Sequence, residues 1–160
     1  MGAKGQRFAS SDLAPAAPVR QRASSWRSTS GLGPGVIVDT SVWVEFLRGG
    51  KGRDPGVVED LIRSSRAVTC GIVLAELLAG VRNADDRNQL QDALAGLDYV
   101  ETREQTWRRA GELAAELRSK GRTLPMSDLI VAALAIEHGL SVFTIDSHFR
   151  HIPGVRLYAH

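Results

Sequence analysis

The sequence predicts an α/β domain in which a central parallel sheet of four to five strands lies between two layers of helices, a three-layer α/β/α sandwich. Short apolar runs alternate with helical segments along residues 36–158, and this alternation is typical of strands joined by helical crossovers. The apolar runs are continuous, as expected for strands buried on both faces. The chain of 160 residues is long enough for one domain with its own core.

Five short segments are the expected strands. The first, residues 36–38, consists of β-branched residues only, which favours extended backbone. Residues 67–70 and 99–100 are the next two. Residues 141–145 are the fourth strand, and residues 155–158 would complete the sheet as a fifth.

Each expected helix begins near a residue suited to a helix N-terminus. Ser41 and Asn83 are N-cap residues, Asp54 precedes a proline at the first helical position, and Thr102 and Gln105 have capping-box spacing. Two further helices are expected at residues 72–81, which are apolar nearly all round, and after Ser127. The first helix should stop at Gly49-Gly50. The helix after Thr102 is expected to bury Trp107, Ala110, Leu113, Ala114 and Leu117.

Charge and composition divide the chain into two parts. The whole chain has 20 basic and 18 acidic residues, and residues 1–35 hold five basic residues against Asp12 alone. This Ser-, Ala-, Gly- and Pro-rich segment predicts a disordered basic extension, with an RNA-contacting arm as the alternative. Residues 36–160 form the expected folded domain. Their own charge is slightly negative, so bulk charge gives no argument for a nucleic-acid partner.

Several features predict a cytoplasmic protein without a membrane partner. Cys70 is the only cysteine, so no internal disulfide can form, and a reducing compartment is expected. No stretch approaches the ~18–20 apolar residues of a membrane span. The apolar part of the extension, residues 13–19, is interrupted by two prolines, so no secretory signal is expected.

Two carboxylates follow expected strands directly. Asp39 comes after residues 36–38, and Asp146 comes after residues 141–145. In parallel α/β sheets, ligands bind at the carboxyl ends of the strands, so both side chains should lie at the same edge. Taken alone, Asp39 could be a helix cap and Asp146 a turn residue.

Two further carboxylates lie on apolar helices. Glu76 is the only charged residue between Ile72 and Val81, and a lone buried carboxylate is costly unless it is paired or binds a metal. A salt bridge to Arg82 is the structural alternative. Asp128 lies in the first turn of the helix after Ser127, where the helix dipole by itself favours a negative charge.

Together, Asp39, Glu76, Asp128 and Asp146 predict a site for a hard divalent cation. Clustered carboxylates raise one another's pKa unless a cation neutralises them, and oxygen ligands favour Mg²⁺ or Mn²⁺. Such a site suits phosphodiester hydrolysis. Hydroxyl groups for hydrogen bonds to the acids are available on Thr40, Ser41 and Thr144. The four histidines show no paired metal-ligand spacing on one helix face: His138, His148, His151 and His160.

Four segments carry a resemblance to a known family. They are VIVDTSVW at 36–43, AEL at 75–77, DLIVAA at 128–133 and TIDSHF at 144–149. In this order and spacing they resemble the motifs of PIN-domain nucleases, and most closely those of the VapC toxins of bacterial toxin–antitoxin pairs. The resemblance covers residues 36–158 and leaves out the extension.

The resemblance implies a PIN-like sandwich, a Mg²⁺ or Mn²⁺ cofactor and cleavage of structured RNA, typically tRNA or ribosomal RNA. It also implies a homodimer and inhibition by a cognate VapB-type antitoxin that covers the acidic groove. By motif position, Asp39 and Asp128 would be the principal metal ligands, completed by Glu76 and Asp146. Some members carry another acid two residues after the fourth carboxylate. His148 stands there in this chain, which leaves open whether a second ion binds.

Three other functions use similar features. A phospho-accepting receiver domain would need an adjacent acidic pair and a strand-end lysine, and a haloacid-dehalogenase-like phosphatase would need an Asp where Ser41 stands. A non-catalytic RNA- or partner-binding domain would not need four intact acids. Five basic residues are candidates for phosphate contacts: Arg48, Lys51, Arg53, Arg122 and Arg150.

Overall fold

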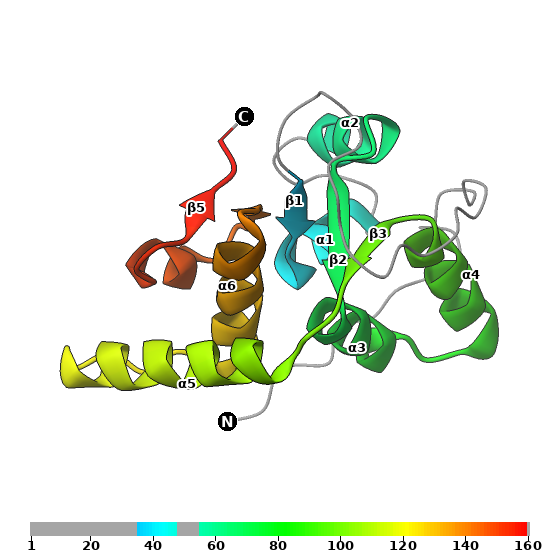
Figure 1. Cartoon of the computed structure of the whole chain (residues 1–160). Helices are drawn as coiled ribbons and strands as arrows, with labels where there is room; N and C mark the ends of the chain where they lie inside the picture. The colour runs from blue at the N-terminus through cyan, green and yellow to red at the C-terminus, as the bar shows by residue number, and fades with distance from the viewer. Residues whose placement is uncertain (1–34, 48–54, 160) are drawn as a thin grey trace.

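The computed structural model describes residues 35–47 and 55–159 (Figure 1). The predicted basic extension lies outside the described residues except for Gly35, which is buried and whose carbonyl accepts a hydrogen bond from Ser141 N (3.1 Å). The expected helix end at Gly49-Gly50 also lies outside them. The domain of residues 36–160 is therefore described almost completely.

Five parallel strands form one sheet, which confirms the predicted α/β class. The strands are β1 (Val36–Val38), β2 (Ala67–Cys70), β3 (Asp98–Val100), β4 (Ser141–Phe143) and β5 (Arg156–Leu157). Their spatial order is β3-β2-β1-β4-β5, with β1 pairing in parallel with both β2 and β4. Every residue of β1 and β2 is buried, as expected for strands covered on both faces.

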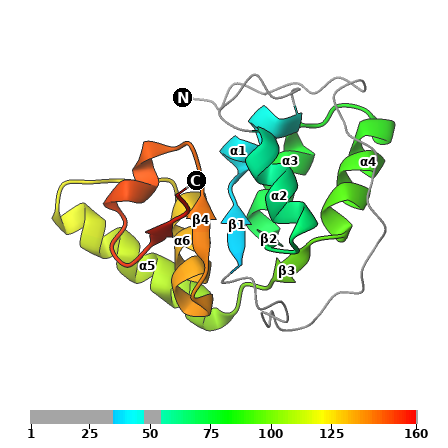
Figure 2. The same cartoon turned by 90° about the horizontal axis from the view of Figure 1, so that it is seen from above.

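Helices connect the strands and flank the sheet, which completes the predicted α/β/α sandwich. The helices are α1 (Thr40–Leu47), α2 (Pro55–Arg63), α3 (Gly71–Gly80), α4 (Ala84–Ala95), α5 (Glu104–Ser119), α6 (Met126–His138) and the short 3₁₀ helix η2 (Ser147–His151). Figure 2 shows α5 and α6 grouped on the β4 side of the molecule and α1 to α4 on the other. No helix in the described part of the chain has the length and apolar character of a membrane span.

Helix α6 is the most deeply buried helix. Its residues Leu129 to Ala135 are all buried, and it ends at Gly139, whose φ of 65° is the left-handed conformation that a C-terminal glycine readily adopts. The buried run starts directly after the first turn of α6, so the core holds the helix just beyond that turn. That turn carries Asp128.

Three helices begin at residues other than the predicted caps. In α5 the N-cap is Arg103 and the residue at the third helical position is Thr106, each one position after the predicted pair Thr102 and Gln105. Helix α1 begins at Thr40, and the backbone carbonyl of Asp39 accepts from Val42 N and Trp43 N (both 3.1 Å). Helix α6 begins at Met126. Ser41 therefore lies inside its helix, where its hydroxyl is available to the side chain of Asp39. By contrast, Asn83 caps α4 as predicted and accepts from Asp86 N (2.8 Å).

Helix α5 buries Ala110, Leu113 and Leu117 and partly buries Ala114, as predicted, but it exposes Trp107. Trp107 is 51% exposed, whereas Thr106 is fully buried. The Thr106 hydroxyl accepts from Arg103 N (3.1 Å) and donates to Glu137 on α6 (2.7 Å). A polar contact between helices thus occupies the buried position in the first turn of α5, and the apolar period alone could not indicate it.

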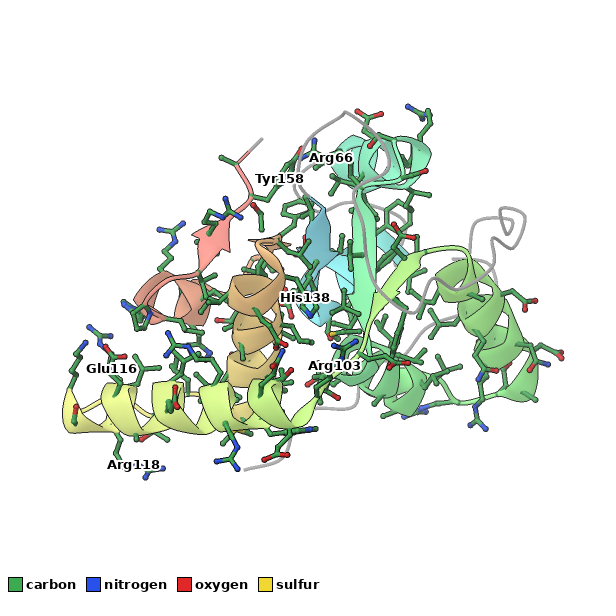
Figure 3. All side chains as sticks on the ribbon, in the orientation of Figure 1. Arg66, Arg103, Glu116, Arg118, His138 and Tyr158 are labelled. Atoms are coloured by element: carbon green, nitrogen blue, oxygen red, sulfur yellow. The ribbon has the colours of Figure 1, made fainter. Side chains whose placement is uncertain are left out.

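The C-terminal segment is tied to the sheet beyond β5. Tyr158 N donates to the carbonyl of Val142 (2.9 Å), and the Tyr158 ring packs edge-on against Phe143. The Arg66 guanidinium lies 5.6 Å from the centre of the same ring, and Figure 3 shows the two side chains together. These contacts support β4, whose end leads to the site.

Candidate metal centre

The sheet has its topological switch point between β1 and β4. From β1 the chain proceeds to β2 and β3 on one side, and it returns to place β4 and β5 on the other. In open α/β sheets, such a point leaves a crevice at the carboxyl ends of the strands. Asp39 follows β1, and its backbone N donates to the carbonyl of Phe143 at the end of β4 (2.9 Å). The loop carrying Asp146 begins directly after Phe143.

Asp39 is a buried carboxylate held by two hydroxyl groups. The residue is 7% exposed, and its Oδ2 accepts from Ser41 Oγ (2.6 Å) and Thr144 Oγ1 (2.9 Å). Burial raises the pKa of Asp39 above its ordinary value, and the hydrogen bonds partly offset this effect. The predicted hydrogen bonds from Ser41 and Thr144 are confirmed, and they orient the carboxylate at the switch point.

Glu76 is exposed, so the prediction that it is a buried charge is wrong. Helix α3 buries Val73 and Leu77 and exposes Ala75 and Glu76. Small alanines make the sequence of this face apolar without requiring its burial. Glu76 is nevertheless fixed, because Thr40 Oγ1 donates to its Oε2 (2.6 Å). The alternative salt bridge to Arg82 is absent among the described residues, which include both side chains.

The position of Glu76 is close to that of Asp39. Thr40, which holds Glu76, follows Asp39 directly in the chain. The pKa of the Cys70 thiol is raised by burial and, to a lesser degree, by the charges of Asp39 and Glu76. Cys70 itself is fully buried.

Asp128 is affected by three neighbouring ionisable groups. Its pKa is raised to about 6, mainly by burial and further by the charges of Asp39 and Asp146. A hydrogen bond to His148 acts in the opposite direction. The structure therefore brings Asp39, Asp128 and Asp146 together, although they lie 18 or more positions apart in the chain.

Asp146 and His148 form a compact turn beside Asp128. Asp146 N donates to Thr144 Oγ1 (3.0 Å), and Asp146 Oδ1 accepts from His148 N (2.8 Å). The His148 Nδ1 atom lies 3.3 Å from Asp128 Oδ2 and 3.2 Å from Asp146 Oδ1. One ligand atom from each of these three residues lies within 4.8 Å of the others.

His148 is not among the metal ligands predicted from the sequence, because no second histidine shares a helix face with it. The signal that could have found it is its position two residues after Asp146. In a tight turn, that separation allows the backbone N of the second residue to bond the first side chain, as observed here.

The donor set fits a divalent cation. Carboxylate oxygens are ligands for Mg²⁺ or Mn²⁺, and an imidazole nitrogen is a common ligand of divalent transition metals. Burial and the neighbouring carboxylates penalise the charged form of Asp128 and so raise its pKa. A cation at this point would remove that penalty. Asp128, Asp146 and His148 form the tightest group among the described residues, with Asp39 adjacent and Glu76 at the rim.

Thr144 is expected to position two of the acids. Thr144→Val removes the donor to Asp39 and the acceptor for Asp146 N, and it should weaken Mn²⁺ binding by about 10-fold or more, as for other residues that orient metal ligands. Thr144→Ser keeps the hydroxyl and should bind within about 3-fold of wild type. Calorimetric titration of Mn²⁺ measures both. Equal binding by the Val and Ser variants would contradict this role.

Known proteins share sequence similarity with this chain along most of the described domain. The sequence profile of the PIN domain family matches residues 36–155. Ribonuclease VapC21 of Mycobacterium tuberculosis (strain H37Rv) is 34% identical over 104 residues, which cover 61% of this chain and 73% of that protein. Ribonuclease VapC1 of Rickettsia felis is 28% identical over 132 residues, which cover 77% of this chain and 94% of that protein.

A solved structure shows the same fold. The VapBC2 complex of Rickettsia felis, bound to a DNA fragment from its promoter, contains a chain that superposes with a TM-score of 0.64 at 26% identity. The match covers 77% of this chain and 96% of that one. The protein described here therefore belongs to the PIN domain family, and its relatives within that family are VapC ribonucleases.

Proposed function

We propose that this protein is a metal-dependent endoribonuclease and the toxin of a toxin–antitoxin pair, with Asp39, Glu76, Asp128 and Asp146 as its catalytic and metal-binding acids. The observation that carries the proposal is the convergence of Asp39, Asp128 and Asp146 at the switch point, close enough to raise the pKa of Asp128. Such a group of carboxylates favours a bound cation, Mg²⁺ with Mn²⁺ as a substitute. The names of the relatives support the choice of RNA as substrate.

Each acid has a separate part in the proposed reaction. When bound, a divalent ion supplies a Lewis acid and an activated water for attack on a phosphodiester. Asp128 and Asp146 would hold the ion, and Asp39 would add negative charge from a carboxylate that Ser41 and Thr144 hold in place. Glu76 is exposed at the rim and oriented by Thr40, so its carboxylate can bind an ion or hold the proton that water releases.

The substrate and partners follow from the family. We propose structured RNA, tRNA or ribosomal RNA, as the substrate, a cognate VapB-type antitoxin as the inhibitor, and a homodimer in the cytoplasm. The Rickettsia felis neighbour is itself a VapBC complex, which supports the antitoxin. Of the basic residues proposed for phosphate contacts, Arg122 and Arg150 are exposed, and the other three lie outside the described residues.

The test is cleavage by the purified full chain. It should cut a mixture of tRNA and ribosomal RNA with Mg²⁺ or Mn²⁺, leave DNA of the same sequence intact, and lose activity in excess EDTA. Undiminished cleavage in EDTA would contradict the metal centre, and cleavage of DNA but not RNA would contradict the substrate. Unimpaired RNA binding without any cleavage would favour the non-catalytic RNA-binding alternative.

Expression in bacteria tests the toxin assignment. Wild type should arrest growth, and co-expression of the small gene adjacent to its own should relieve the arrest. Asp146→Asn should be harmless at an equal protein level, because it removes a metal-binding charge. Colony counts measure the growth arrest, and immunoblots measure the protein level. Equal arrest by wild type and variant would show that growth inhibition does not depend on this site.

A further inference from the structure

We propose that His148 is a metal ligand, and that the ion it shares with Asp128 and Asp146 has a mixed nitrogen and oxygen donor set that favours Mn²⁺ over Mg²⁺. The inference rests on the proposed metal-dependent function and adds to it the identity of a ligand and of the preferred ion. It concerns a residue outside the four carboxylates.

The distances fit one small ion. Neighbouring ligands of an octahedral ion with bonds of ~2.0–2.1 Å lie about 3 Å apart. The His148 Nδ1 atom lies 3.3 Å from Asp128 Oδ2 and 3.2 Å from Asp146 Oδ1. The nitrogen therefore faces both carboxylates at once, at separations close to those of ligands on adjacent corners.

The backbone holds His148 in this place. Its N–H donates to Asp146 Oδ1 (2.8 Å), and Asp146 N in turn donates to Thr144 Oγ1 (3.0 Å). The next residue, Phe149, is 1% exposed and anchors helix η2 in the core. The site needs little rearrangement to bind an ion, which lowers the free-energy cost of binding.

The site also leaves room for other ligands. The side chain of His148 is 45% exposed and that of Asp146 is 37% exposed, whereas that of Asp128 is 15% exposed. An ion bound here would be buried on the Asp128 side and open to solvent on the other. The open side can receive water and a phosphate oxygen.

The nitrogen donor decides the preferred metal. Mg²⁺ is bound almost entirely by oxygen, whereas imidazole is a common ligand of the later divalent metals, and affinity for such donors rises from Mn²⁺ onwards. Because only one donor is an imidazole and the others are carboxylates, the site still prefers an ion with six ligands. This set therefore favours Mn²⁺ over Mg²⁺ by affinity.

A different role for His148 makes opposite predictions. The imidazole could act as a positive counter-ion that bridges Asp128 and Asp146 and leaves when metal binds. Its removal would then strengthen Mn²⁺ binding by eliminating a competitor. A ligand, by contrast, weakens binding when it is removed and leaves a nitrogen signal on the bound metal.

The experiment measures the binding of Mn²⁺ to the full chain and the nitrogen ligands of the bound ion. Pulsed electron paramagnetic resonance should detect ¹⁴N coupling to bound Mn²⁺ in wild type and in His151→Asn, an exposed histidine of the same helix outside the metal-ligand group. The coupling should vanish in His148→Asp and His148→Ala.

Calorimetry should give wild type at least about a 10-fold preference for Mn²⁺ over Mg²⁺. His148→Asp should reduce this preference, and His148→Ala should weaken Mn²⁺ binding about 10-fold.

Each outcome is decisive. Bound Mn²⁺ without ¹⁴N coupling in wild type, or tighter binding by His148→Ala, would overturn the ligand role while leaving the metal-dependent nuclease intact. Absence of Mn²⁺ and Mg²⁺ binding to wild type would overturn both the ligand role and the proposed function. Circular dichroism of each variant at the titration temperature shows that it is folded.

Discussion

Asp39→Asn is expected to lower the rate of metal-dependent RNA cleavage by about 10²–10³-fold or more, as for loss of one group that stabilises charge in a transition state. Asparagine has nearly the same shape and keeps an oxygen that can accept from Ser41 and Thr144. The change therefore removes the charge of a buried carboxylate and little else. Single-turnover cleavage of a defined RNA at saturating Mg²⁺ measures the effect.

The matched control is Asp60→Asn. Asp60 is exposed on α2 and forms an ion pair with Arg63 (2.6 Å), remote from the switch point. Its loss should change the cleavage rate by less than about 2-fold, since exposed ion pairs contribute little. If Asp39→Asn behaved like Asp60→Asn, the buried carboxylate at the end of β1 would have no part in catalysis.

Asp128→Asn is expected to stabilise the metal-free protein at pH 8. The pKa of Asp128 is raised to about 6 in the folded protein from its ordinary value of 3.8, so the folded state binds its proton more tightly than the unfolded state does. The free energy of unfolding therefore falls as the pH rises from 3.8 towards 6, and this loss of stability remains at every pH above 6. Removing the charge should add about 1–3 kcal/mol to the free energy of unfolding at pH 8, less what the lost bond to His148 contributed.

Urea unfolding in EDTA at pH 8 and pH 4.5 tests this prediction. The gain from Asp128→Asn should be largest at pH 8 and shrink at pH 4.5, because the wild-type carboxyl is then mostly protonated. Saturating Mn²⁺ should make wild type the more stable of the two proteins at pH 8, since the bound ion stabilises wild type. A variant less stable than wild type at pH 8 without metal would show that Asp128 is already compensated by its neighbours.

The sequence was sufficient to predict the parallel sheet and the edge at which the acids meet. The alternation of strands and helices along the chain is typical of a parallel sheet covered by helices. Asp39 and Asp146 follow their strands directly. Order within the sheet required the structure, because the placement of β4 beside β1 depends on contacts between distant segments. That placement brings Asp128 and Asp146 to Asp39.

The errors in the sequence interpretation have local physical causes. Glu76 was expected to be buried because Ala75 and Ala79 make its helix face apolar, yet both alanines are exposed. Trp107 fits the apolar period of α5, but the buried position in the first turn belongs to Thr106, whose hydroxyl donates to Glu137. His148 was missed because its partners are a turn neighbour and a residue 20 positions away.

Anomalous diffraction from crystals of the full chain grown with Mn²⁺ locates the bound ion. We expect an anomalous peak at the carboxyl ends of β1 and β4, within coordination distance of Asp128 and Asp146 and beside Asp39. The peak should be lost in crystals of Asp128→Asn. If the protein cleaves RNA with Mn²⁺ but its only metal peak lies away from these carboxylates, the proposed metal centre is wrong.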